Sequence, residues 1–566
     1  MSDNEKIGVY LCAGCGIGDA VDIAALERVA SEEFKATICQ RHDHLCGADG
    51  LAVISTDIAS GGLDKAVIAA CSPRAMSDRF DLDGAHVVRA NLREQVVWCH
   101  PAGDEDTQML AADQLRMAIV EATKTTAPQP WMEGEFSATV LVVGGGFAGM
   151  TAAVETAKAG YRAILVERTG RLGGMSPIGA KVLAETPPYR GLLNSPLPAL
   201  IEAVEKESRI TVMREATVAK TSGMPGKFAV ELAQAGAVTT QTVGAIVVAT
   251  GWRPYDAGKL GHLGYGASPD VISTHQMDEM LAAGPVARKS DGKAPKAVAF
   301  VQCAGSRDPE HLAYCSSVCC GASIRQALQL VEGDPAIMVY VLYQEIRTPG
   351  MAEEHYRAAQ EAGVVFIKGK VSSVGADLTV TIDDALLGGE TEMSGLDLVV
   401  LATGMVPNST NLEAPSPELD EEKLAPLKPD IDPRAPIAVA GYAGDAPEPT
   451  PPAEPPLPEG GPILNLQYRQ GPHLPLLADG FADSHYICFP YETRRTGIYA
   501  CGPVRRPMDL GETALDAAGA ALKAIQTIRN VKQGRALHPR SGDLSFPKIV
   551  LDTCTKCRRC TVECPF

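Results

Sequence analysis

Short apolar runs alternate with helical patterns over the N-terminal part of the chain. Residues 6–12 (KIGVYLC) and 65–71 (KAVIAAC) are mostly apolar runs that are typical of buried strands. Residues 22–30 (DIAALERVA) and 107–122 space their apolar positions as an amphipathic helix does. The alternation predicts a small α/β domain over residues 1–130.

A second, larger series of strands and helices follows, and we expect one domain over residues 137–535. Residues 126–136 combine two prolines with mixed polarity, which indicates a linker. Residues 446–462 hold eight prolines in 17 residues, which predicts a stiff spacer on the surface. Residues 546–566 begin with a short apolar run and end with four closely spaced cysteines. We expect this block to start a further module that continues in the natural polypeptide.

The composition is that of a folded, acidic protein. Of its 566 residues 45% are hydrophobic, so the chain can form several cores and is not disordered. The net charge of −18 disfavours nucleic acid or anionic lipid as the main partner, since both require a cationic surface. No apolar run approaches the ~20 residues of a spanning helix, and the first residues lack a signal core. We expect a cytoplasmic protein that reaches a membrane only through a partner.

Cysteine usage indicates redox chemistry. The chain has 16 cysteines, and twelve of them fall into three groups. In a cytosolic chain of this size, grouped cysteines are typical of metal or redox ligands rather than of disulfides. The pattern therefore predicts a protein with several redox centres.

A dinucleotide-binding fingerprint opens the second domain. Gly144, Gly146 and Gly149 form G-x-G-x-x-G directly after the apolar run 140–143, and a helical pattern follows. The first glycine permits the turn, the second lets the backbone approach a pyrophosphate, and the third allows close helix–strand packing. Glu167 ends the next apolar run, where a carboxylate can accept hydrogen bonds from a ribose.

Three further segments resemble two-dinucleotide flavoproteins such as thioredoxin reductase. They are residues 168–175 (RTGRLGGM), 246–254 (IVVATGWRP) and 399–407 (VVLATGMVP). The resemblance implies that the nucleotide is FAD. The residues that it adds to the FAD site are Arg168, Gly173, Gly174, Thr250, Gly251, Gly404, Gly502 and Thr513.

The features by which such reductases use NAD(P)H are absent from this sequence. A second glycine fingerprint is expected near residue 300, but the apolar run 296–301 continues into Gln302-Cys303-Ala304-Gly305. The C-x-x-C disulfide of these reductases is also missing. We therefore expect that NAD(P)H does not reduce the flavin.

The group of Cys303, Cys315, Cys319 and Cys320 predicts a four-thiolate site. The sulfurs converge if Cys303 lies at a strand end and the others at the entry to a helix over residues 321–330. A helix N-terminus also favours thiolate over thiol. Four thiolates bind zinc or an iron–sulfur cluster, and a flavin domain favours the redox-active choice. The alternative is a set of inert, buried cysteines.

Several motifs in order resemble the HdrA subunits of heterodisulfide reductases and their relatives over nearly the whole chain. They are GVYLC, AACSPR, NLREQ, GGGFAGM and CAGSRD…YCSSVCC. Residues 484–526, followed by HPRSGDLSFP, resemble more closely the QmoB subunits of quinone-interacting membrane-bound oxidoreductases. The resemblance implies an electron-transfer subunit of sulfur metabolism. Its implied partners are adenylylsulfate (APS) reductase, a second HdrA-like flavoprotein and a quinone-reactive membrane subunit.

The N-terminal cysteines form the second group. HdrA-like proteins bind a [4Fe–4S] cluster in this domain, and the resemblance implies Cys12, Cys15, Cys46 and Cys71 as its ligands, with Cys39 in reserve. The alternative is a domain that keeps free thiols. His42 and His44 are interpreted as solvated loop residues.

The C-terminal group has the C-x2-C-x2-C-x3-C-P spacing of a ferredoxin. In two-cluster ferredoxins the first three cysteines share one [4Fe–4S] cluster and the fourth ligates the other. The residues concerned are Cys554, Cys557, Cys560 and Cys564. Lys556, Arg558 and Arg559 stand among them, either as charges that act on the cluster or as a solvated loop.

Two other functions remain open from the sequence. One is an HdrA-type enzyme that bifurcates electrons at the flavin, although Arg325 replaces the lysine that bifurcating members carry. The other is a partner-binding scaffold that has lost its redox centres. Cys488 and Cys501 are expected to be core residues. The arginines at 494, 495, 505 and 506 are expected either to contact FAD or a partner or to form a solvated face.

Overall fold

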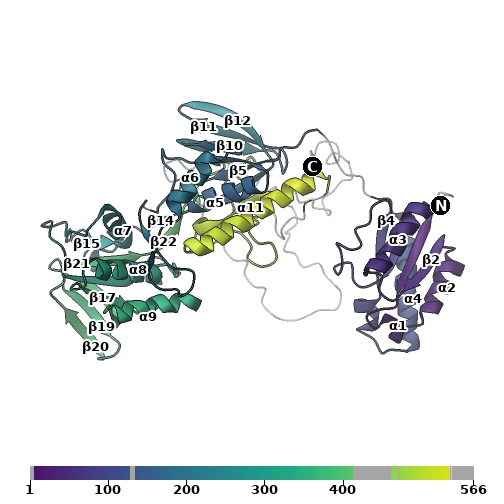
Figure 1. Cartoon of the computed structure of the whole chain (residues 1–566), viewed down its shortest axis with the longest axis horizontal. Coiled ribbons are helices and arrows are strands. Elements are labelled where there is room, and N and C mark those ends of the chain that lie inside the picture. Colours follow the sequence, from purple (N-terminus) through teal and green to yellow (C-terminus); the bar gives the residue numbers. More distant parts are fainter. Residues whose placement is uncertain are drawn as a thin grey trace, which may run out of the picture. The chain divides into compact units, whose positions relative to one another are not determined.

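The computed structural model describes residues 6–127, 134–176, 178–411, 460–468, 471–535 and 537. The chain divides into two compact units, Met1–Pro130 and Trp131–Phe566, which are described separately (Figure 1). Most of the proline-rich segment and the whole C-terminal cysteine group lie outside the described residues.

The first unit is built on a four-stranded parallel sheet with the order β2-β1-β3-β4. Its strands are β1 (Ile7–Cys12), β2 (Ile38–His42), β3 (Lys65–Ala70) and β4 (His86–Asn91). Its helices are α1 (Ile17–Ala20), α2 (Ile23–Arg28), α3 (Ala48–Gly61) and α4 (Glu105–Lys124). All of β3 is buried, as its continuous apolar run predicts for a central parallel strand.

The helix predicted over residues 22–30 forms as α2 and continues as a π-helical turn, Val29–Glu33. Asp22 caps it, because its carboxylate accepts hydrogen bonds from the backbone N–H groups of Ala24 and Ala25. The small α/β domain predicted from the alternation of patterns is therefore present.

The second unit contains two subdomains, and the first is formed from two sheets. A five-stranded parallel sheet has the order β25-β13-β5-β6-β9, and a three-stranded antiparallel sheet has the order β10-β11-β12. The strands are β5 (Thr139–Val143), β6 (Arg162–Val166), β9 (Ile210–Met213), β10 (Ala216–Ser222), β11 (Phe228–Gln234), β12 (Ala237–Val243), β13 (Ala245–Val248) and β25 (Ile498–Ala500). The helices are α5 (Phe147–Lys158), α6 (Leu197–Lys206) and α11 (Leu510–Lys532).

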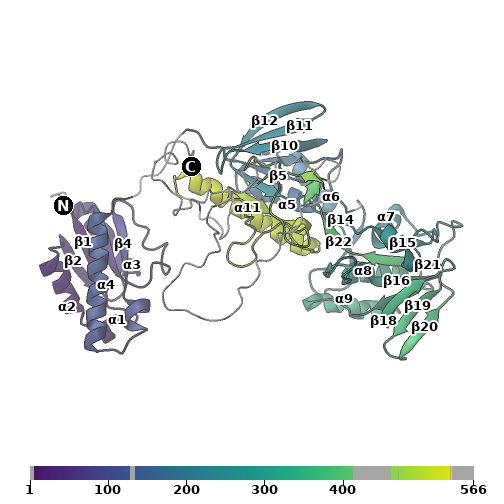
Figure 2. The ribbon, with the colours of Figure 1, turned by 180° about the vertical axis from the view of Figure 1, so that it is seen from behind.

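Helix α11 returns late in the chain to lie along α5, as both views show (Figures 1 and 2). Small residues on both helices, among them Ala153, Ala157 and Ala520, are buried in this contact. The contact positions the start of α11 beside the glycine turn.

The second subdomain is a seven-stranded sheet with the order β15-β21-β16-β17-β18-β19-β20. Its strands are β15 (Val271–Ser273), β16 (Ala297–Ala304), β17 (Met338–Tyr343), β18 (Val365–Val374), β19 (Val380–Asp384), β20 (Gly389–Met393) and β21 (Leu398–Thr403). Helices α7 (Thr274–Ala283), α8 (Cys319–Gly333) and α9 (Glu353–Glu361) pack on it (Figure 1). The paired strands β14 (Trp252–Pro254) and β22 (Met405–Pro407) connect the two subdomains.

The hairpin of β7 (Lys181–Leu183) and β8 (Leu192–Asn194) and the short pair of β23 (Thr410–Asn411) and β24 (Gly461–Pro462) complete the described strands. The fold is α/β, and the second unit consists of two subdomains that β14 and β22 connect. None of the helices that the structure describes is long and apolar enough to cross a membrane.

Candidate cofactor and metal site

A cavity of about 1230 Å³ lies between the two subdomains of the second unit. The first turns of several helices line it, and a helix start leaves backbone N–H groups without helical partners. The lining residues at these ends include Phe147 of α5, Cys319 of α8 and Leu510 of α11. Such an arrangement favours a negatively charged ligand.

The glycine turn borders this cavity as the fingerprint predicts. Gly144 adopts a left-handed conformation (φ 113°), and a Cβ there would lie 2.3 Å from the carbonyl oxygen of Ala249. A Cβ on Gly149 would lie 1.8 Å from the carbonyl oxygen of Gly144. A Cβ on Gly146 would meet only the Cα of Gly174, at 3.8 Å. Gly144 and Gly149 are therefore required for packing, whereas Gly146 leaves open space at the start of α5.

Glu167 follows β6 directly and lines the cavity. Its Oε2 accepts a hydrogen bond from the backbone N–H of Gly145 at 2.7 Å, and its Oε1 accepts from the backbone N–H and the hydroxyl of Thr169, both at 2.8 Å. These bonds hold the carboxylate against the glycine turn. Oε2 keeps one lone pair for a ligand hydroxyl, whereas Oε1 already accepts two hydrogen bonds.

Other predicted residues also line the cavity. Gly173 donates its N–H to the carbonyl oxygen of Gly145 at 2.9 Å, so the loop that carries Gly173 and Gly174 is held beside the glycine turn. The hydroxyl of Thr250 donates to the carbonyl oxygen of Asn408 at 2.6 Å. The cavity lining also includes Arg168, Gly251 and Thr513.

Three predicted residues do not line the cavity: Gly149, which packs α5 against the strand, Gly404 and Gly502. A Cβ on Gly404 would lie 2.3 Å from the hydroxyl of Ser306 and 2.5 Å from that of Ser316, so Gly404 allows close packing behind β21. Gly502 donates its N–H to Asp516 at 2.8 Å beneath the cavity, and its neighbour Pro503 is the lining residue.

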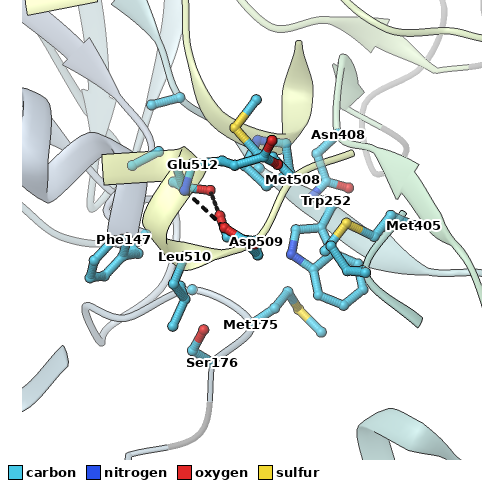
Figure 3. A pocket seen from close by; sticks show the side chains of 18 of the residues that line it. Phe147, Met175, Ser176, Trp252, Met405, Asn408, Met508, Asp509, Leu510 and Glu512 are labelled. Carbon is cyan, nitrogen blue, oxygen red and sulfur yellow. Dashed lines mark hydrogen bonds between the residues drawn. The ribbon is translucent and has the colours of Figure 1, made fainter. Parts of the chain in front are cut away.

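The structure adds side chains that sequence reasoning missed. Figure 3 shows Phe147 and Leu510 on one side of the pocket and Trp252, Met405 and Asn408 on the other. These residues come from helix starts and from the β14–β22 connection. Phe147, Trp252 and Met405 lie within the quoted motifs, but those motifs mark the neighbouring glycines rather than these side chains.

Glu185 is a further missed residue in the lining. Burial and the nearby carboxylate of Asp509 raise its pKa above the usual value. Asp509 caps α11, because its carboxylate accepts the N–H of Glu512 at 2.8 Å (Figure 3).

The four cysteines of the group between residues 303 and 320 line one small hollow beside the cavity. Cys303 lies one residue before the end of β16, and Cys319 and Cys320 are the first residues of α8. Cys315 lies in the loop between these elements. The predicted meeting of a strand end and a helix start is confirmed.

The backbone around this hollow is strained. Cys303, Arg307 and Ser317 have φ values of 58°, 60° and 59°, in the left-handed region that costs non-glycine residues about 1–2 kcal/mol each. The register of β16 on β21 shifts between Val301 and Ala304, so a bulge turns Cys303 toward the hollow. Strain of this kind gathers at functional sites.

Three of the four thiols are held in the protonated form at neutral pH. Burial raises the pKa of Cys303, Cys319 and Cys320, and for Cys319 the neighbouring sulfurs raise it further. The expected thiolate preference of the helix start is therefore wrong for the free thiols of Cys319 and Cys320, since desolvation outweighs the helix N-terminus. Metal binding would displace these protons.

The thiols at the helix start point to backbone oxygens rather than to one centre. Cys319 donates to the carbonyl oxygen of Thr403 at 3.8 Å and Cys320 to that of Glu345 at 3.9 Å. Within the described ranges, no three His, Cys, Asp or Glu side chains stand together as a ready set of metal ligands. The shared hollow and the four soft donors nevertheless fit an iron–sulfur cluster or zinc after side-chain rotation.

The N-terminal unit places the cysteines that the resemblance implies near one another, although no three of them form a ready ligand set in the described residues. Cys12 ends β1, Cys71 follows the neighbouring parallel strand β3, and Cys46 precedes α3. Burial raises the pKa of Cys12, and the sulfurs of Cys46 and Cys15 raise it further. The reserve ligand Cys39 lies beside Glu27, and burial raises its pKa to about 11.

An arginine contacts this N-terminal group. Arg89 of β4 donates through Nη2 to the sulfur of Cys71 at 3.3 Å and to the carbonyl oxygen of Cys71 at 3.0 Å. The four soft donors and the adjacent cation fit a metal cluster with a net negative charge.

Two expectations for isolated residues need correction. Cys501 is buried as predicted, but Cys488 is exposed, because His485 accepts the N–H groups of residues 487–489 and turns them outward. The four arginines do not behave alike: Arg495 is 1% exposed and Arg505 forms a buried ion pair with Asp516 at 2.6 Å, whereas the side chains of Arg494 and Arg506 are 37% and 36% exposed.

A glycine turn that opens onto a cavity between two α/β subdomains is the arrangement of an oxidoreductase that binds a dinucleotide. The profile of the pyridine nucleotide-disulphide oxidoreductase family matches residues 138–286. Thioredoxin reductases of T. acidophilum and Lactococcus lactis are similar in fold, with TM-scores of 0.41 and 0.40 and identities of 14% and 16%. They cover 69% and 70% of this chain, and the matches span 99% and 100% of theirs.

The sequence comparison is more specific, because it finds similarity to the A subunits of heterodisulfide reductases. The HdrA subunit of the ferredoxin/F(420)H(2)-dependent CoB-CoM heterodisulfide reductase of Methanosarcina acetivorans is 30% identical over 71% of this chain. That match spans 62% of the relative's length. The HdrA subunit of the H(2):CoB-CoM heterodisulfide,ferredoxin reductase of Methanothermobacter marburgensis is 27% identical over 100% of this chain and 90% of its own.

Proposed function

We propose that the chain is an FAD- and [4Fe–4S]-containing electron-transfer subunit of a redox complex. The observation that carries this proposal is that the large cavity and the four-cysteine hollow share Ser317, Cys319 and Arg347 in their linings. A flavin in the cavity and a cluster on the cysteines would therefore be separated by single side chains. Such contact suits direct electron transfer.

The residues that would hold FAD follow from the cavity. The open space at Gly146 accepts a pyrophosphate at the start of α5, and Glu167 accepts a ribose hydroxyl. Trp252, Met405 and Leu510 would cover the flavin ring and exclude water (Figure 3). Bound FAD supplies the exchange between electron pairs and single electrons.

The cysteines would hold the clusters. We assign one [4Fe–4S] cluster to Cys303, Cys315, Cys319 and Cys320 and a second to Cys12, Cys15, Cys46 and Cys71. The third group, from Cys554 to Cys564, lies outside the described residues and is proposed from its spacing alone.

Within this function we propose a QmoB-like role between APS reductase and a quinone-reactive membrane subunit, next to a second HdrA-like flavoprotein. The support is the resemblance of residues 484–526. In this role the chain is a cytoplasmic protein, associated with the membrane through its partner. Purification of the complex with identification of its subunits tests this proposal, and the absence of any quinone-reactive subunit would contradict it.

An HdrA-type bifurcating subunit is the second candidate, and the names of the relatives favour it. Against it we weigh Arg325, which lines the cavity and forms a double hydrogen bond with Asp278 at 2.7 and 2.8 Å. The pairing uses only Nη2, and the buried Nη1 has no hydrogen-bond partner among the described residues, so the weight against bifurcation rests on the replacement of the lysine. Bifurcation requires crossed one-electron flavin potentials, and an anaerobic redox titration of the flavin distinguishes the two functions.

The redox function itself predicts a coloured protein. After anaerobic purification we expect one FAD per chain and at least about eight iron atoms, because two cysteine groups in the described residues can each hold a four-iron cluster. Absorbance, iron analysis and electron paramagnetic resonance measure this. A colourless, folded protein would favour the scaffold function instead.

We further predict that NADH and NADPH do not reduce the flavin rapidly. Residues 305–318 separate β16 from α8, and they carry a cysteine instead of the short glycine turn that a nicotinamide nucleotide needs. Stopped-flow absorbance under anaerobic conditions measures the rate, with dithionite as the positive control. Bleaching within seconds by either nucleotide would show that this prediction is wrong.

A further inference from the structure

The four-cysteine hollow carries a group of charges that the proposed function does not use. Arg307 and Arg347 both line the hollow, and both pair with the same carboxylate oxygen of Glu345, at 3.2 and 3.4 Å. The side chains of Arg347 and Glu345 are about half exposed (51% and 55%), whereas that of Arg307 is 27% exposed. Arg307 is therefore the least exposed of these three charged side chains.

Arg307 also has an unused donor. Its Nη1 is buried and has no hydrogen-bond partner within the described part of the chain. A buried N–H without an acceptor destabilises the fold, because its desolvation is not compensated. Its backbone is in the left-handed region at φ 60°, so the chain accepts strain as well as an unmet donor at this residue.

Two backbone N–H groups in the same hollow already donate to sulfur. Ser317 donates to Cys315 and Arg347 to Cys320, both at 3.4 Å. The surroundings are thus built to supply hydrogen bonds and positive charge to sulfur atoms. Arg307 Nη1 is the donor that these thiols leave unused.

We propose that the charge and the N–H groups of Arg307 raise the reduction potential of the metal centre in this hollow, and that the carboxylate of Glu345 lowers it. The inference rests on the proposed function, because it requires a cluster on these cysteines. Reduction adds one negative charge to the cluster, and a nearby cation and N–H···S bonds stabilise the reduced form. Glu345 stabilises the oxidised form in the same way.

The test is a redox titration of the anaerobically purified full chain, followed by electron paramagnetic resonance, with iron and acid-labile sulfide measured in parallel. We expect Arg307→Met to lower the midpoint potential of this cluster and Glu345→Gln to raise it. Arg307→Lys keeps the charge without the planar donor, so its potential is expected to lie between those of the wild type and Arg307→Met.

The matched control is Arg347→Met. This variant removes the other arginine that pairs with the Glu345 carboxylate but keeps the backbone N–H that donates to Cys320. We expect a smaller shift from this variant, because its side chain is half exposed and screened by water. Equal shifts in Arg307→Met and Arg347→Met would overturn the specific role of Arg307. An unchanged potential in Arg307→Met with full iron content would overturn it as well.

Glu345→Gln keeps the inference testable if Arg307→Met loses its cluster, since the Glu345 side chain is exposed and its replacement spares the fold. A potential that falls or does not move in Glu345→Gln would overturn the inference. Failure of the proposed function gives a different result. In that case, replacing Cys319 by serine while keeping Arg307 and Glu345 would leave the iron content unchanged.

Discussion

Replacement of Cys319 by serine is expected to remove about four iron atoms per chain and to leave FAD bound. Cys319 is the cysteine that lines both the hollow and the large cavity, so its loss removes a ligand at the point nearest the proposed flavin. The FAD site rests on the glycine turn at the end of β5, which belongs to the other subdomain. Iron analysis and flavin absorbance measure the two effects, and electron transfer between flavin and cluster should stop.

The matched control is Cys501→Ser. Cys501 is fully buried but lines neither the large cavity nor the four-cysteine hollow, so its replacement should leave the iron content unchanged. The variant also measures the cost of burying a hydroxyl group. An unchanged iron content in Cys319→Ser, or zinc in place of iron, would contradict the cluster assignment.

Replacement of Gly146 by valine is expected to give a folded protein without FAD. A Cβ at this position meets only Gly174, at 3.8 Å, so a larger side chain enters the open space at the start of α5 rather than the core. That space is where the pyrophosphate must approach the backbone. Flavin content after purification and circular dichroism of the same sample measure the result.

Gly149→Ala provides the contrast. Its Cβ would lie 1.8 Å from the carbonyl oxygen of Gly144, so α5 must move away from the strand and the subdomain is destabilised. We expect this variant to lower the melting temperature as well as flavin content. Full FAD in folded Gly146→Val would contradict the site.

The strand–turn–helix unit and the main cysteine site could be predicted because both depend on short-range patterns. The turn at Gly144 is specified by its own residues and the apolar run before it. The sulfurs of Cys303 and Cys319 come together because one ends a strand and the other starts the helix that packs on that strand. Neither inference requires knowledge of a distant contact.

The predictions that differ from the structure depend on packing of a separate loop, on a local hydrogen-bonded turn or on burial. Gly404 follows Ala-Thr at a strand end just as Gly251 does, but Ser306 and Ser316 from a separate loop pack against it. Cys488 stands between apolar residues, yet His485 turns this segment outward. At Cys319 the helix start favours thiolate, but burial of the sulfur reverses the preference.

The loop of residues 305–318 has a consequence for how the second subdomain is supplied with electrons. It begins at the end of β16, a central strand of its sheet, where a glycine turn would otherwise bind a diffusing nucleotide. A cluster at the same strand end stays bound through every turnover, whereas a nucleotide has to be replaced from solution. The rate at which this half of the protein delivers electrons would then be independent of any nucleotide concentration, and would follow how often the next protein docks.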